Sequence, residues 1–190
     1  MKAQKKQRYE VLDMAMANSA MVSLRCRAKG GWKYNGYVVG LSENFVLLQN
    51  ALEHVFLNGY SVFPLRELIS VKTLPDDFLH RVLQMDNQFP SAPSGIVMDD
   101  WQSLVASADA HFPLVTLHLE HEYPDSCYIG RVSEIKKRAV TLREISPKAK
   151  WIKEREPYRF KDITQVDFGG RYEAALWRVA QSELSGSENV

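Results

Sequence analysis

The chain has 190 residues, a formal net charge of +1, and 45% hydrophobic and 25% charged residues, as in an ordinary globular protein. No apolar run reaches the roughly 20 residues of a membrane helix, and no apolar signal core follows the basic N-terminus. Two cysteines, Cys26 and Cys127, without a Cys-x-x-Cys pair, fit neither a secreted disulfide framework nor a zinc site, so we expect a cytoplasmic protein with no cofactor or metal.

The first half of the chain reads as one helix followed by short strands. Apolar spacing predicts a helix over residues 9–20, and residues 1–8 before it are expected to form a flexible tail. Alternating residues then predict strands over 22–26, through Gly36 and over 44–48. A loop is expected over 49–60. A fourth strand, a polar turn at Arg66-Glu67, a fifth strand and a short helix over 79–84 complete this half.

The second half repeats the same series after a linker rich in Pro, Ser and Gly at residues 89–98. Asp99 is the expected N-cap of its first helix, with Gln102 in a capping box. Strands follow over 115–120, through Gly130 and over 138–142. A loop over 145–157, a turn at Lys161-Asp162, a helix over 176–181 and a flexible tail over 185–190 end the chain.

An internal repeat underlies this parallel. Gly36 returns as Gly130 and Val46 as Val140, 94 residues later in both cases, and Leu68 returns as Ile163 after 95 residues. Self-similarity of this length indicates a duplicated structural unit. We therefore expect two domains, residues 9–88 and 99–184.

The repeated pattern resembles the Sm-like and SH3-like family of small β-barrels. The resemblance rests on Gly36/Gly130, Val46/Val140, Phe63/Tyr158 and the turns at residues 65–68 and 160–163. It implies a mainly β (α+β) chain with two tandem five-stranded small barrels, each with an N-terminal helix and a short C-terminal helix. The turns before the last strands read Pro64-Leu65-Arg66 and Arg159-Phe160-Lys161, and lack the Arg-Gly-Asn element of the RNA-binding Sm proteins.

Charge is unevenly distributed, with an acidic stretch over residues 76–125 and a basic stretch over 131–161. Cations neutralise phosphates and an aromatic face stacks on a base, so the basic second unit is a candidate surface for single-stranded RNA or another polyanion. Its candidate residues are Lys136, Lys137, Arg138, Lys148, Lys150, Trp151, Lys153 and Arg155. The alternative interpretation is a solvated hairpin with Trp151 packed on the barrel. Acidic and basic stretches could also pair within a chain or in a homo-oligomer.

A second hypothesis is a protein-interaction adaptor. Trp32 and Tyr34 lie in one hairpin loop, where they either anchor a protein partner together with exposed strand edges or cap the open end of the barrel. His118 and His121 would point to opposite faces of a strand and therefore do not predict a metal site. No nucleophile elbow, phosphate loop or dinucleotide fingerprint occurs, so we expect a binding protein and not an enzyme.

Overall fold

The computed structural model describes residues 2–28, 32–52, 55–75, 78–152 and 157–186, which form ten strands and four helices. Neighbouring strands pair antiparallel, so the chain is mainly β as the sequence predicts. It divides into two compact units, residues 1–94 and 95–190. None of the helices among these residues has both the length and the apolar character needed to cross a bilayer.

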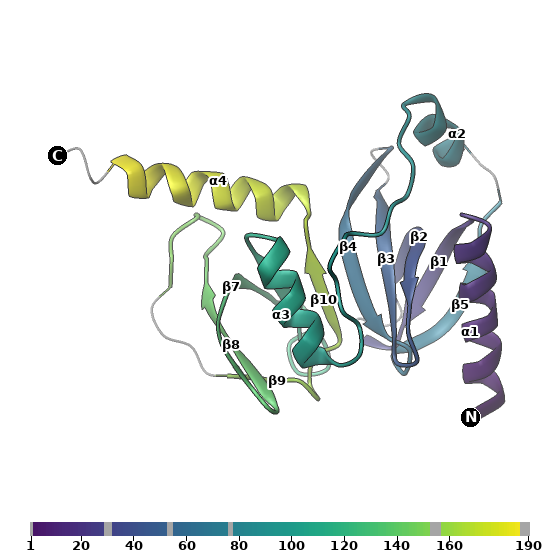
Figure 1. Cartoon of the computed structure of the whole chain (residues 1–190), viewed down its shortest axis with the longest axis horizontal. Helices are drawn as coiled ribbons and strands as arrows, with labels where there is room; N and C mark the ends of the chain where they lie inside the picture. Colours follow the sequence, from purple (N-terminus) through teal and green to yellow (C-terminus); the bar gives the residue numbers. More distant parts are fainter. Residues whose placement is uncertain (1, 29–31, 53–54, 76–77, 153–156, 187–190) are drawn as a thin grey trace. The chain divides into compact units, whose positions relative to one another are not determined.

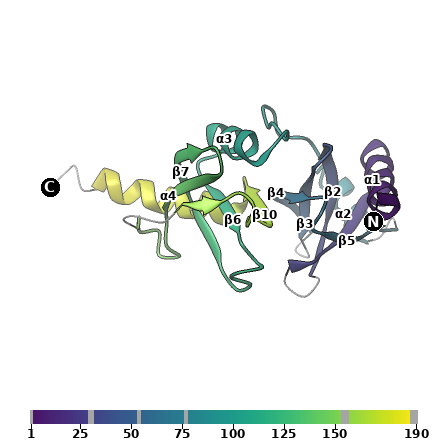
Figure 2. The ribbon, with the colours of Figure 1, turned by 90° about the horizontal axis from the view of Figure 1, so that it is seen from below.

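The first unit is an antiparallel sheet with the strand order β5-β1-β2-β3-β4 and two helices. Its elements are α1 (Lys2–Ala17), β1 (Met21–Cys26), β2 (Lys33–Leu41), β3 (Phe45–Leu52), β4 (Phe56–Pro64), β5 (Leu68–Thr73) and α2 (Phe78–Met85). In both ribbon views α1 runs alongside β5 (Figure 1; Figure 2).

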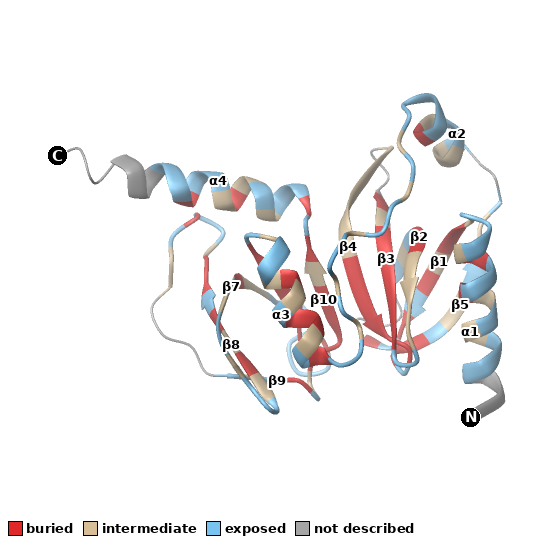
Figure 3. Cartoon of the chain, in the orientation of Figure 1, coloured by how far each residue is buried: buried red, intermediate tan, exposed pale blue. Residues whose placement is uncertain are grey.

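The core of the first unit lies between α1 and the sheet. Leu12 and Ala15 are the buried helix residues, and they pack with apolar side chains from all five strands, among them Leu24, Leu48 and Phe63. Burial is continuous along much of β3, whereas the outer side of α1 is exposed (Figure 3). The apolar spacing that predicts α1 from sequence is therefore its contact face with the sheet.

The second unit has the same strand order, β10-β6-β7-β8-β9, when its strands are matched to those of the first. Its elements are α3 (Trp101–His111), β6 (Val115–His118), β7 (Cys127–Lys136), β8 (Ala139–Glu144), β9 (Tyr158–Arg159), β10 (Gln165–Phe168) and α4 (Arg171–Gly186). The internal repeat in the sequence thus corresponds to a repeat of strand topology. In neither unit do the described residues pair the two end strands with each other.

The two repeated glycines serve the same close strand approach. A Cβ on Gly36 would lie 2.2 Å from the carbonyl oxygen of Gln49, and one on Gly130 would lie 2.4 Å from that of Arg143. Both glycines are followed by a bulge at the equivalent place, with Val39 the extra residue in β2 and Ser133 the extra residue in β7. A bulge leaves one residue unpaired and changes which residues face each other beyond it.

Two expectations about the first unit are wrong. Residues 2–8 are not a tail but the first two turns of α1, and Arg8 ties them to the sheet by donating to the carbonyl of Leu68 at 2.5 Å. The expected loop over residues 49–60 is instead largely strand, because β3 continues to Leu52 and β4 begins at Phe56, with Ala51 paired to Leu57; residues 53–54 lie outside the described residues. The described residues of this segment carry no charged side chain, and their apolar side chains favour a continued strand.

In the second unit the helix boundaries differ from the expected ones. The N-cap of α3 is Asp100 and not Asp99, since its Oδ1 accepts from the backbone N of Ser103 at 2.8 Å. This backbone hydrogen bond, together with a weaker effect from the Ser103 hydroxyl, holds the pKa of the Asp100 carboxyl below its usual value of 3.8. The helix α4 is longer than the predicted 176–181 and continues to Gly186, while residues 187–190 of the expected tail lie outside the described residues.

Candidate functional site

The cations of the basic stretch lie at opposite ends of one hairpin. Lys136, Lys137 and Arg138 are exposed at the turn between β7 and β8, while Lys148 and Lys150 are exposed in the loop that leaves the far end of β8. The six residues of β8 separate the two groups, which amounts to about 17–20 Å of strand. The residues predicted to bind nucleic acid therefore form two separate surfaces.

The loop after β8 is a compact hairpin that directs its lysines outward. Ile145 and Trp151 form a β-bridge, and the backbone N of Ser146 donates to the carbonyl of Lys150 at 2.9 Å. Ala149 has the left-handed φ of 57° and is only 4% exposed, packed with apolar residues of α4. Burial of Ala149 leaves its neighbours Lys148 and Lys150 in solvent.

Trp151 supports an arginine. The guanidinium carbon of Arg143 lies 4.6 Å from the centroid of the Trp151 ring, and Trp177 of α4 meets that ring edge-on with a centroid separation of 6.3 Å. A cation over an indole face at this distance is a favourable cation–π contact. The ring therefore orients a guanidinium, which differs from the base-stacking role expected from the sequence.

A second arginine repeats the arrangement on the adjacent strand. Arg131 of β7 pairs directly with Arg143 of β8, and its guanidinium carbon lies 5.5 Å from the centroid of the Trp177 ring. We call Arg131, Arg143, Trp151 and Trp177 the arginine–tryptophan surface. Like charges directly opposite each other on two strands repel, so this register has an electrostatic cost in the absence of an anion.

Neither arginine has a carboxylate partner within the part of the chain that the structure describes. Both side chains are exposed, and Lys148 and Lys150 extend from the same end of β8. By contrast Lys136, at the turn, forms an ion pair with Glu134 at 3.0 Å. At the arginine–tryptophan surface, no described acid neutralises Arg131 or Arg143. Lys153 and Arg155, also expected to take part, lie outside the described residues.

The two aromatic residues proposed for a protein partner differ in exposure. Trp32 is 62% exposed, whereas Tyr34 packs against the core with its ring centroid 4.8 Å from that of Phe63. Tyr34 is therefore half-buried against the core of the first unit. Only Trp32 is presented to solvent.

His118 belongs to a polar face of β6 and β10. Its Nε2 lies 2.8 Å from Oδ2 of Asp167, and the amide of Gln165 donates to the other carboxylate oxygen of Asp167 at 2.7 Å. His121 lies after the strand and is exposed. Over the ranges described, no three His, Cys, Asp or Glu side chains are grouped so as to hold a metal ion.

Sequence reasoning missed Arg131, Arg143 and Trp177. Arg131 and Arg143 stand in the basic stretch, but their spacing from the turn does not reveal that they face each other, because the bulge at Ser133 intervenes. Comparison of the chain with known protein families, with curated proteins and with solved structures gave no match.

Proposed function

We propose that the chain is a non-enzymatic binding protein and that its second unit binds single-stranded nucleic acid, in particular RNA. The observation that carries this proposal is the pair Arg131 and Arg143, two exposed arginines that face each other across β7 and β8, each with its guanidinium over a tryptophan ring. Lys148 and Lys150 extend the same positive surface. A polyanion would relieve the repulsion between these groups and contribute the missing negative charge.

Arginine suits this role better than lysine would. Its planar guanidinium presents a fork of donors that matches two phosphate oxygens, and stacking on an indole leaves the donor edge free to reach them. Because Arg143 covers Trp151, we assign phosphate contacts to the arginines and no base stacking to that ring. Contacts of this kind are tolerant of sequence, so the proposed ligand is a backbone and not a particular base order.

We further propose that each unit is a small barrel of the Sm-like or SH3-like type and that the protein acts in the cytoplasm. The strand order, which is the same in both units, and the shared glycine and bulge support the first point. Cys26 and Cys127 form no disulfide, which supports the second.

The experiment is fluorescence anisotropy with a labelled single-stranded RNA of mixed sequence at about 50 and 200 mM salt. With four phosphate contacts, the logarithm of the binding constant should fall with the logarithm of the salt concentration at a slope of about −2.8. Affinity should therefore fall roughly 50-fold over this range. The double variant Arg131→Gln/Arg143→Gln should lose at least tenfold in affinity at low salt, and its slope should shrink by about 1.4.

The matched control is Lys136→Gln/Lys137→Gln, which removes the same charge from the other end of the hairpin. It should change affinity less than threefold. Absence of binding at 50 mM salt, or equal losses in both double variants, would refute the assignment to the arginine–tryptophan surface. Circular dichroism of each variant establishes that the fold is retained.

A further inference from the structure

The first unit contains a groove of about 720 Å³ between α1 and β5. Its walls come from one flank of the helix, one edge of the strand and the residue after β1, and its lining residues are Gln7, Arg8, Val11, Arg27, Ile69, Ser70 and Val71. The volume falls within the range of ligand-binding pockets. Two of these residues are cationic and none is acidic, so the groove is electrostatically suited to an anion.

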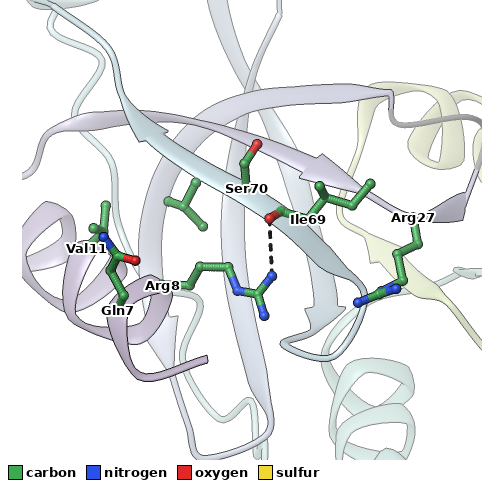
Figure 4. A pocket seen from close by; sticks show the side chains of 7 residues that line it. Gln7, Arg8, Val11, Arg27, Ile69 and Ser70 are labelled. Carbon is green, nitrogen blue, oxygen red and sulfur yellow. Dashed lines mark hydrogen bonds between the residues drawn. The ribbon is translucent and has the colours of Figure 1, made fainter. Parts of the chain in front are cut away.

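Both arginines are held in place by backbone carbonyls. Nη1 of Arg8 donates to Leu68 and to Ile69, the latter at 3.2 Å, and Nε of Arg27 donates to the carbonyl of Arg66 at 3.3 Å. Among the described residues neither forms an ion pair with a carboxylate. Figure 4 shows both side chains near Ile69, with the dashed hydrogen bond from Arg8 to its backbone carbonyl oxygen. Their positions are therefore fixed while their charge is not neutralised.

The strand that forms the groove is the end of its sheet. β5 pairs with β1 on one side, and among the described residues no strand of the first unit covers its other side. Arg8 occupies the carbonyls of Leu68 and Ile69, so the edge that continues through Ser70 and Val71 is the part left for another chain. Ile69 is 45% exposed and adds an apolar contact beside it. An open strand edge with an adjacent helix flank accommodates an extended peptide.

We propose that this groove binds an extended segment of a partner protein that carries a carboxylate. The peptide backbone pairs with the outer edge of β5 near Ser70 and Val71. Its carboxylate, on an Asp or Glu side chain, accepts from the guanidinium groups of Arg8 and Arg27. Apolar side chains on alternate positions cover Val11 and Ile69. This site is independent of the arginine–tryptophan surface, since all its residues belong to the first unit.

The test uses the 190-residue chain and a fluorescein-labelled, C-terminally amidated hexapeptide of alternating Val and Glu, with polarisation and two-dimensional NMR as readouts. Peptides with Gln in place of Glu, and with Pro at two of the three Val positions, serve as matched ligands. We expect the Val-Glu peptide to bind with a Kd below 1 mM and to shift the amide signals of α1 and β5. The Gln and Pro peptides should bind at least tenfold more weakly, because one lacks the carboxylate and the other cannot donate to the strand.

Three variants locate the site. Arg27→Gln and Arg8→Gln should each weaken the Val-Glu peptide about tenfold, whereas Lys6→Gln, an exposed change on the same helix outside the groove, should leave it unchanged. Arg27→Gln keeps the test valid if Arg8→Gln loosens α1. The proposal is overturned by equal affinity for the Gln peptide, by no binding at 1 mM, or by shifts that leave α1, β5 and Arg27 unaffected. It is equally overturned if RNA shifts these signals, or if a groove-dependent dimer of the protein blocks the peptide.

Discussion

Arg131 on β7 stands directly opposite Arg143 on β8, and the two guanidinium groups lie over two tryptophan rings that meet edge-on. Opposite charges or apolar groups in such a cross-strand position stabilise a hairpin, whereas like charges destabilise it. Here the rings orient the cations, and no acid among the described residues neutralises them. A surface of this kind is arranged for an anion from outside the chain.

Replacing Arg143 by Lys distinguishes the contribution of stacking to RNA affinity from the contribution of charge. The charge is retained, so the salt slope of RNA binding should stay within 0.3 of the unaltered protein's. Affinity should fall about fivefold, because the lysine loses the planar stack and the fork of donors, together worth about 1 kcal/mol. Anisotropy titrations at three salt concentrations measure both quantities. A reduced slope with unchanged affinity at low salt would contradict this role for the guanidinium.

Gly36 and Gly130 should each be intolerant of alanine. The added Cβ would come within 2.2 Å and 2.4 Å of a backbone oxygen on the neighbouring strand, which cannot move aside as a side chain can. We expect Gly36→Ala and Gly130→Ala each to reduce the free energy of unfolding by about 1–3 kcal/mol. Chemical denaturation measures this, with Asn35→Ala, an exposed change on β2 beside Gly36, as a control that should cost less than about 0.5 kcal/mol. A neutral Gly130→Ala would mean that the strands can separate at this point.

Asp100 should make the stability of α3 dependent on pH. Its pKa is lowered in the folded protein, so its contribution is present above the unfolded pKa near 3.8 and is lost as the pH falls through the folded pKa. Asp100→Ala should cost about 1 kcal/mol at pH 7, whereas Asp100→Asn should retain the cap. Urea unfolding at pH 7 and pH 3 tests this. The unaltered protein should lose stability relative to Asp100→Asn at the lower pH, and no such change would contradict the cap.

Tyr37 should help hold α2 on the sheet. Its side chain is only 2% exposed, and its hydroxyl lies 2.7 Å from Nδ1 of His80 on that helix. Tyr37→Phe removes this hydrogen bond and should cost about 1 kcal/mol. Faster hydrogen exchange of the α2 amides is the expected local result. Tyr172→Phe, an exposed change on α4, is the control, and equal effects of the two changes would exclude a specific clamp.

How much of this could be predicted from sequence differs from element to element. The repeat of Gly36 and Gly130 predicts two units of like topology, because a glycine needed for close strand approach recurs wherever that approach recurs. Alternation predicts the strands less well at their ends. The segment from Gln49 to Tyr60 reads as a loop, yet cross-strand pairing keeps most of it in β3 and β4. Tertiary contacts override local pattern in such segments.

The candidate site shows the same limit. Counting evenly from the turn after Lys136 would place Arg131 opposite Glu144 and predict an ordinary ion pair. The extra residue Ser133 shifts the register by one, so that Gly130 faces Glu144 and Arg131 faces Arg143. A glycine inside a strand, such as Gly130, indicates a bend or bulge nearby, but it does not tell which residue is the extra one. The basic stretch itself is visible in the sequence, but its division into two ends of a hairpin is not.

The hydrogen bonds of Arg8 have a consequence for how the protein behaves in concentrated solution. A bare sheet edge recruits other chains and seeds aggregates, and proteins protect such edges with charged groups or covering elements. The guanidinium of Arg8 takes the place of the donors that an intruding strand would offer to Leu68 and Ile69. A chain shortened to begin at Tyr9 would lose this protection of the β5 edge. Its tendency to form intermolecular β-structure should therefore rise even where its helical and sheet content is preserved.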